Sequence, residues 1–106
     1  MRTLVISEPG PVSPPPEAIP LLLEAFRGWR ERWRPKMEAF EFFVTGGGWG
    51  VVNTVDETEL SQCIMEFPFG PFSAVQARPT VNGDEALARL TQTMTQMMAA
   101  MGGATQ

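Results

Sequence analysis

Apolar side chains on both faces of the predicted strands constrain the fold of this chain more than any other feature. Residues 2–7 and 49–55 predict strands centred on Leu4-Val5-Ile6 and Val51-Val52, and the run Phe-Glu-Phe-Phe-Val-Thr at 40–45 predicts another. A sheet with one face in water alternates apolar and polar residues along each strand, and these strands do not alternate. Both faces of the predicted sheet must therefore be covered.

Two helical patterns lie between the strands. Apolar residues at spacings of 3, 4, 3 and 4 predict an amphipathic helix that begins near Glu17 and ends before Pro35. Asp56 and Glu59 form a variant of the capping box, which predicts a short helix that stops at Pro68. The apolar face of the first helix consists of Ile19, Leu22, Phe26, Trp29 and Trp33.

With a fourth strand at 72–80, the order of elements is βαββαβ, the ferredoxin-like arrangement of an α+β domain with a four-stranded antiparallel sheet. Right-handed connections place both helices on one face of that sheet. A second copy of the chain, packed sheet against sheet, is predicted to cover the other face and form a homodimer. A proline-rich loop at 8–16 and a C-terminal helix at 83–101, with a stripe of leucine and methionine, complete the predicted domain.

Length and charge exclude several classes of protein. A chain of 106 residues forms one domain, predicted to span 1–106. A net charge of −4 argues against a nucleic-acid-binding protein. No apolar run reaches the roughly 18 residues of a membrane span, and the first seven residues do not resemble a signal peptide. A single cysteine, Cys63, fits a reducing compartment, so we expect a cytoplasmic protein.

The chain contains no histidine and no tyrosine. The absence of histidine removes the usual metal ligand, the usual neutral-pH base and the axial ligand of most haem sites. Acid–base chemistry must then use carboxylates, lysine, cysteine or water. The sequence predicts neither a metal nor a cofactor.

Polar residues inside otherwise apolar strands are the candidates for chemistry. Glu41 is the predicted proton-transfer base, and Asn53 is predicted to hydrogen-bond a lactone or enolate oxygen beside it. Gln76 is predicted to assist, and Arg78 to hold a substrate carboxylate. In the alternative interpretation, Glu41 and Arg78 face solvent or pair with each other, and the two amides bond the backbone.

Aromatic and basic residues supply further candidates. Trp33, Phe43 and Trp49 complete the predicted substrate-binding set, with Trp49 either at the mouth of a pocket or in plain packing. Cations from Arg27 to Lys36 suggest an anion site or, more simply, stabilisation of a helix C-terminus. The glycines at 46–48 precede a strand rather than a helix, which indicates a hairpin turn and not a phosphate loop.

Residues 52–81 resemble the muconolactone isomerase family. In both, a strand leads into a short acidic-capped helix, a turn rich in proline and phenylalanine follows, and the last strand ends in a proline, here Pro79. The Asp84-Glu85-Ala86 start of the C-terminal helix is similar to that of short bacterial domains of the same superfamily.

The resemblance implies a dimeric α+β barrel that binds small organic ligands between sheet and helices. It also implies an isomerase or cyclase that acts on a lactone- or polyketide-like substrate by carboxylate-mediated proton transfer. Two alternatives stay open: a dimer that binds a small ligand without turnover, and a cofactor-free aromatic monooxygenase.

Overall fold

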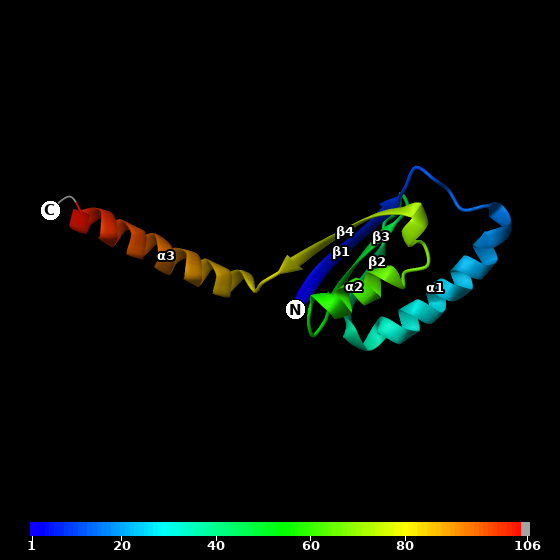
Figure 1. Cartoon of the computed structure of the whole chain (residues 1–106), viewed down its shortest axis with the longest axis horizontal. Helices are drawn as coiled ribbons and strands as arrows, with labels where there is room; N and C mark the ends of the chain where they lie inside the picture. Colours follow the sequence, from blue (N-terminus) through cyan, green and yellow to red (C-terminus); the bar gives the residue numbers. More distant parts are fainter. Residues whose placement is uncertain (105–106) are drawn as a thin grey trace.

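The structure is a computed structural model of the chain, and it describes residues 1–104, so that the last two residues of the predicted domain 1–106 lie outside it. A four-stranded antiparallel sheet has the strand order β2-β3-β1-β4, and helices α1 and α2 pack on one face (Figure 1). The predicted ferredoxin-like order is thereby confirmed. The elements are β1 (Arg2–Pro9), α1 (Ile19–Trp33), β2 (Met37–Phe42), β3 (Gly48–Asn53), α2 (Glu57–Met65), β4 (Ser73–Thr80) and α3 (Gly83–Ala104).

The register of the two central strands decides which side chains meet the helices. Thr3 lies opposite Val52 and Val5 lies opposite Gly50, and these positions form the inner face, toward α1 and α2. Side chains alternate along each strand, so the residues between them point to the other side. The core beneath the helices consists of Trp33, Val52, Leu60 and Cys63.

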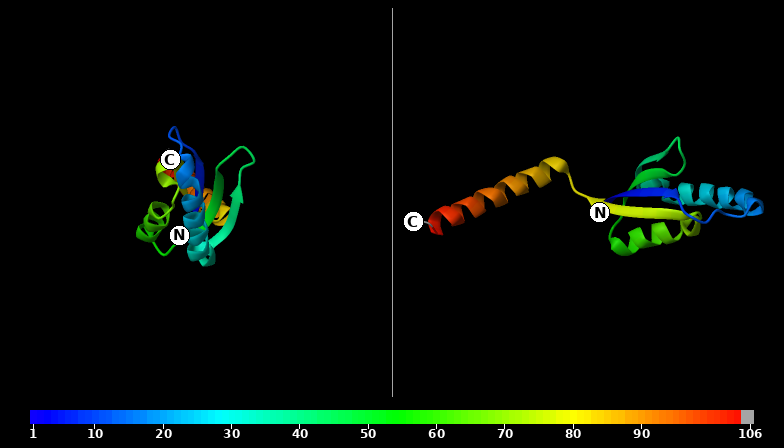
Figure 2. Two further views of the ribbon diagram at one scale, coloured as in Figure 1. Left: turned by 90° about the vertical axis from the view of Figure 1, so that its right-hand side faces the viewer. Right: turned by 90° about the horizontal axis from the view of Figure 1, so that it is seen from above.

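The opposite side of the sheet, here called the outer face, is covered by neither α1 nor α2 (Figure 2). On it, Leu4 lies opposite Val51 and Ile6 lies opposite Trp49. The central strands are therefore apolar on both sides, as the sequence predicts. This is the surface on which the prediction of a homodimer rests.

Helix α1 follows the predicted apolar stripe. A short 3-10 helix at Pro16–Ala18 leads into it, and Pro20 lies in its first turn, where a missing amide hydrogen costs nothing. The helix ends at Trp33, before Pro35. Trp33 is only 5% exposed, so the last turn of α1 is anchored in the core.

The hairpin between β2 and β3 differs from the prediction in the bounds of both strands. β2 begins at Met37 and ends at Phe42, so the predicted strand 40–45 is displaced, and its last three residues, 43–45, lie in the connection. β3 begins at Gly48 and ends at Asn53, one residue before the predicted start at 49 and two before the predicted end at 55. Gly47 has a φ of +80°, in the left-handed region that favours glycine. A Cβ atom at Gly47 would also overlap the carbonyl oxygen of Ser7, so this turn requires glycine on two grounds.

Helix α3 projects away from the rest of the molecule (Figure 1). The radius of gyration is 19.9 Å, against about 13 Å for a compact domain of this length. Asn82 caps the helix, because its side-chain oxygen accepts a hydrogen bond from the Glu85 amide at 3.0 Å. Its stripe residues Leu87, Leu90, Met94, Met97 and Met101 are 51–67% exposed. Neither α3 nor any other described helix is long and apolar enough to cross a membrane.

Candidate functional site

A cavity of about 370 Å³ lies between the inner face of the sheet and the two helices. Its existence follows from β3, whose inner positions are Gly48, Gly50 and Val52. The two glycines place no side chain where the neighbouring strands have Ser7 and Phe40, so space remains under the helices. The volume falls at the lower end of the range for small-molecule pockets.

Aromatic residues form most of the wall. Phe26 of α1 lies at the centre of a cluster, with its ring centroid 5.6 Å from those of Trp29 and Phe67 and 5.8 Å from that of Phe40. These separations and tilted geometries are typical of favourable ring pairs. Of the ten aromatic residues in the chain, eight line the cavity: Phe26, Trp29, Phe40, Phe42, Trp49, Phe67, Phe69 and Phe72.

Few polar groups interrupt this wall. Ser7, Ser13 and Ser73 contribute hydroxyls, and Glu8 is the only carboxylate among the described lining residues. Glu8 is exposed and alternates on β1 with the inner-face residue Ser7, so it contributes to the edge of the cavity and not to its interior. The site is therefore an apolar chamber with serine hydroxyls, and no charged residue described as lining it lies in its interior.

Cys63 also lines the cavity but is a poor nucleophile. Burial, and after it the nearby carboxylates of Glu66 and Glu59, together raise the pKa of its thiol to about 12. A thiol with this pKa stays protonated at neutral pH. Its backbone carbonyl accepts a hydrogen bond of 2.9 Å from the Trp29 indole, which fixes one aromatic wall to α2.

The rim is built from segments that are far apart in sequence. The Gly10 amide donates a 2.8 Å hydrogen bond to the Phe72 carbonyl, which ties the proline-rich loop to the start of β4. Val12 on that loop and Phe42 at the end of β2 are 60% and 67% exposed. The opening is therefore bordered by apolar side chains that water still reaches.

Among the seven residues predicted from sequence, only Trp49 belongs to a segment that lines the cavity, residues 47–52 of the hairpin, although its position opposite Ile6 places its side chain on the outer face. Glu41 is exposed on β2, and Phe43 follows the end of that strand. Gln76 and Arg78 are exposed on β4 and are joined to each other by a 3.4 Å hydrogen bond. The roles assigned to these residues stay predictions.

Trp33 belongs to the core rather than to the cavity wall. Its indole donates a 3.3 Å hydrogen bond to the Glu66 carboxylate, and its side chain packs with Leu60 and Val52. The two aromatic residues that do not line the cavity are thus Trp33 and Phe43, both of which the sequence assigns to substrate binding.

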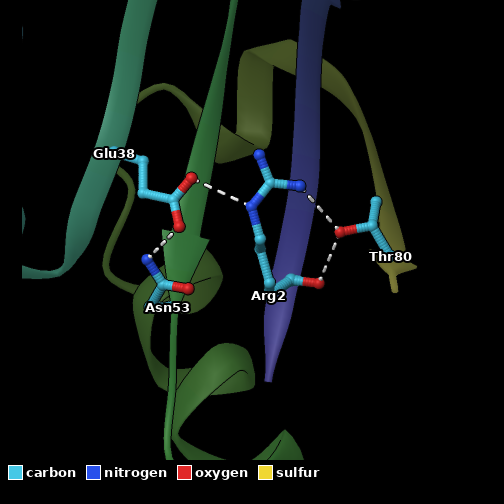
Figure 3. Close-up of polar contacts among 4 residues, drawn as sticks. All are labelled: Arg2, Glu38, Asn53 and Thr80. Carbon is cyan, nitrogen blue, oxygen red and sulfur yellow. Dashed lines mark hydrogen bonds and ion pairs between the residues drawn. The ribbon is translucent and has the colours of Figure 1, made fainter. Parts of the chain in front are cut away.

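Asn53 lies in a polar network with Arg2, Glu38 and Thr80 (Figure 3). Thr80 ends β4, so the network lies at the end of the sheet nearest the start of α3. Its side-chain amide donates to Glu38 at 2.9 Å, and Arg2 donates to the same carboxylate at 2.9 Å. Arg2 also bonds Thr80 at 3.2 Å, so the network connects all four strands. These hydrogen bonds, from Asn53 first and then Arg2, hold the pKa of Glu38 below its ordinary value.

The basic cluster at the end of α1 is occupied by carboxylates. Arg32 pairs with Glu66 at 3.0 Å, and Lys36 pairs with Glu59 at 2.5 Å. Arg34 pairs with Glu31. Three of its five cations are therefore paired with carboxylates, and Arg30 lies over the ring of Phe40. No group of histidine, cysteine and carboxylate side chains within residues 1–104 is arranged to hold a metal ion.

Sequence reasoning missed most of the aromatic wall. It assigned Phe26 and Trp29 to the core and treated the phenylalanines after α2 only as part of a turn. The available indication was the combination of Gly48 and Gly50 at alternate positions of β3 with aromatic residues on the facing helices. Glycines at inner-face positions leave space and so predict a cavity. A polar residue in a strand does not by itself indicate which face of the sheet its side chain is on.

Comparisons with known proteins support the fold. No protein-family model and no curated protein sequence matches the chain. Among solved structures, muconolactone isomerase is similar with a TM-score of 0.68 at 14% identity, over 77% of this chain and 90% of that one. A 5-chloro-2-hydroxyhydroquinone dehydrochlorinase from Burkholderia phenoliruptrix, in complex with 2,5-dihydroxybenzoquinone, is similar with a TM-score of 0.61 at 12% identity, over 80% and 98%.

At these identities the likeness shows the fold alone. The resemblance to the muconolactone isomerase family is confirmed at that level. Both similar structures are of proteins named for reactions of small organic molecules, so this fold supports small-molecule catalysis.

Proposed function

We propose that this chain is an isomerase or cyclase that binds an aromatic or lactone-like molecule in the cavity between sheet and helices. The observation that carries the proposal is the cavity itself, about 370 Å³ in volume and lined by eight aromatic residues. A flat ring that enters it leaves water and gains ring contacts, each worth about 0.5–1.5 kcal/mol beyond the burial of area. The size suits a ligand of one or two rings.

We assign proton transfer to Glu8, because it is the only acidic residue among the described residues that line the cavity. Its position on β1, between the inner-face residues Ser7 and Pro9, directs its side chain to the outer side of the strand, so the carboxylate would reach a ligand only at the edge of the cavity. As a base, Glu8 would take a proton from a carbon next to a carbonyl group. The electron pair of the broken C–H bond moves to the carbonyl oxygen, and a hydroxyl from Ser7 or Ser73 can donate to that oxygen. Return of the proton from Glu8 to a different carbon completes an isomerisation without a cofactor.

This assignment is tested without knowledge of the natural substrate. The probe is 2-tetralone, an uncharged bicyclic ketone whose α-protons exchange with deuterium in heavy water, followed by NMR. The wild-type chain should accelerate the exchange, and Glu8→Gln should remove about 99% or more of the acceleration, since a positioned base contributes roughly 10²–10⁴-fold.

Glu41→Gln is the matched control for that experiment. It makes the same chemical change on the exposed side of β2 and should leave the acceleration intact. The opposite result, loss in Glu41→Gln with full activity in Glu8→Gln, would return the role to the base predicted from sequence.

A second candidate function is ligand binding without turnover. It is favoured by the scarcity of polar groups in the wall, where three serines, one neutral thiol and one rim carboxylate are available. This candidate predicts that the chain binds 2-tetralone saturably and leaves its rate of exchange unchanged.

We also propose that the chain acts as a homodimer joined through the outer face of the sheet. Leu4, Ile6, Trp49 and Val51 lie on that face, and α1 and α2 cover only the other one. The exposed stripe of α3 is assigned to the same assembly, packed on the partner subunit, since methionine adapts to irregular surfaces.

A further inference from the structure

The charges of the chain are distributed so that no cation reaches the cavity. Of the eight arginine and lysine residues, none is among the described residues that line it. Arg2, Arg32, Arg34 and Lys36 are each paired with a carboxylate, and Arg78 bonds Gln76. The guanidinium of Arg30 lies over the ring of Phe40, 4.6 Å from its centroid, so this cation is engaged with the ring of a lining residue.

The groups that do line the cavity disfavour negative charge. Glu8, at the edge of the cavity, is the only charged residue among the described lining residues, and its negative charge disfavours an incoming anion. The behaviour of Cys63 reports on the interior, because burial is the largest cause that keeps its thiol protonated. An anionic ligand would leave water and meet serine hydroxyls and aromatic walls but no counter-charge.

We infer that the cavity accepts uncharged aromatic ligands and rejects the same rings when they carry a carboxylate. The inference rests on the proposed function, because it names the class of molecule for that same cavity. It adds a selection by charge, since burial of an unpaired carboxylate costs far more than ring contacts return. Hydroxyl and carbonyl substituents are compatible, because Ser7, Ser13 and Ser73 can bond them.

The test compares two probes that share one ring system. At neutral pH, 2-naphthol is uncharged and 2-naphthoate is an anion, and their binding to the full-length chain is measured by isothermal titration calorimetry. We expect 2-naphthol to bind at least about 100-fold more tightly, a difference of about 2.7 kcal/mol. Glu8→Gln should reduce this ratio of affinities, because it weakens the repulsion of 2-naphthoate. The affinity for 2-naphthol should change little.

Two variants at Ser73 test the effect of a cation in the cavity: one introduces a positive charge and the other is its uncharged control. Ser73 lines the cavity and is the first residue of the edge strand β4. Ser73→Lys should raise the affinity for 2-naphthoate about tenfold or more, as expected for a close ion pair out of water. Ser73→Met adds a side chain of similar length without charge and should not raise it.

The possible outcomes distinguish failure of the selection by charge from failure of the proposed function of the cavity. Equal binding of naphthol and naphthoate by the wild-type chain would overturn the selection by charge and leave the proposed cavity function standing. Loss of naphthoate binding in Arg30→Met would identify Arg30 as a hidden partner and would also overturn the inference. Failure of 2-naphthol to bind at all would overturn the proposed function itself.

Discussion

Helices α1 and α3 carry apolar stripes with the same spacing, yet only α1 is packed on the sheet. In α1 the stripe includes Trp33, 5% exposed, and Phe26, whose ring meets five others. In α3 the stripe from Leu87 to Met101 is more than half exposed throughout. The difference teaches that periodicity identifies an apolar face and says nothing about what covers it.

Composition separates the two helices where periodicity does not. The stripe of α1 combines aromatic residues, which bury a large area in fixed geometry, whereas that of α3 contains only leucine and methionine. Helices in proteins gain most of their stability from packing of an apolar face, and the apolar face of the 22-residue α3 is exposed. We therefore treat α1 as a wall of the cavity and α3 as a surface for assembly.

The largest expected effect is on stability, when one stripe residue is truncated in α1 and one in α3. Trp29→Ala removes ring contacts to Phe26 and Phe67 and the hydrogen bond to Cys63, and should lower the free energy of unfolding by about 3 kcal/mol. Met97→Ala in α3 should cost less than about 0.5 kcal/mol at low protein concentration. Urea denaturation measures both, with Gln96→Ala as the control on α3. Equal costs in the two helices would break the comparison.

Much of the fold could be predicted from the sequence, as the comparison of α1 and α3 illustrates. The order of elements, the ends of α1 and the cap of α2 follow from prolines, the carboxylate of Asp56 and apolar spacing, and the structure bears them out. All of these are local properties of the chain. The outer-face apolar pairs could also be anticipated, since alternation along a strand needs no knowledge of its partners.

The site could not be predicted in the same way. Whether Asn53 points to the cavity or to the outer face depends on the register of β3 against β1, which local sequence does not specify. The aromatic wall depends on Phe26 and Phe67 meeting across two helices, a contact between distant segments. The cavity became visible only when the glycines of β3 were placed beneath those rings.

An intermediate effect is expected on association. If the α3 stripe packs on a partner subunit, Met94→Glu should weaken dimerisation by about tenfold or more, because a charge would replace a buried methionine. Gln92→Glu places the same charge on the other side of the helix and should leave the dimer almost unchanged. Sedimentation velocity over a range of concentrations measures both. A similar loss in the two variants, or a monomer at every concentration, would contradict the assignment of α3 to assembly.

The smallest effect concerns acid stability of the packed part. The ion pair with Lys36, followed by a hydrogen bond from the Val55 amide, lowers the pKa of Glu59 below its ordinary value of 4.5. A carboxyl with a lowered pKa contributes stability above 4.5 and loses it as the pH falls through the lower folded-state pKa. The wild-type chain should therefore be slightly more stable than Glu59→Gln at pH 7, and this advantage should vanish in acid.

Glu57→Gln on the same helix is the control for that measurement, since Glu57 is exposed and forms no part of the ion pair between Lys36 and Glu59. Thermal unfolding from pH 7 down to pH 3 provides the comparison. An advantage over Glu59→Gln that grows as the pH falls would contradict the sign of the argument.

The central claim is that the ring-lined cavity between sheet and helices is where this protein binds its small molecule. A crystal structure of the full chain with 2-naphthol tests it most directly. The account predicts electron density for the ligand enclosed by Phe26, Trp29 and Phe67, above Gly50 of β3. Density on the outer face beside Glu41 or Asn53, with the cavity empty, would contradict the account and return the site to the residues predicted from sequence.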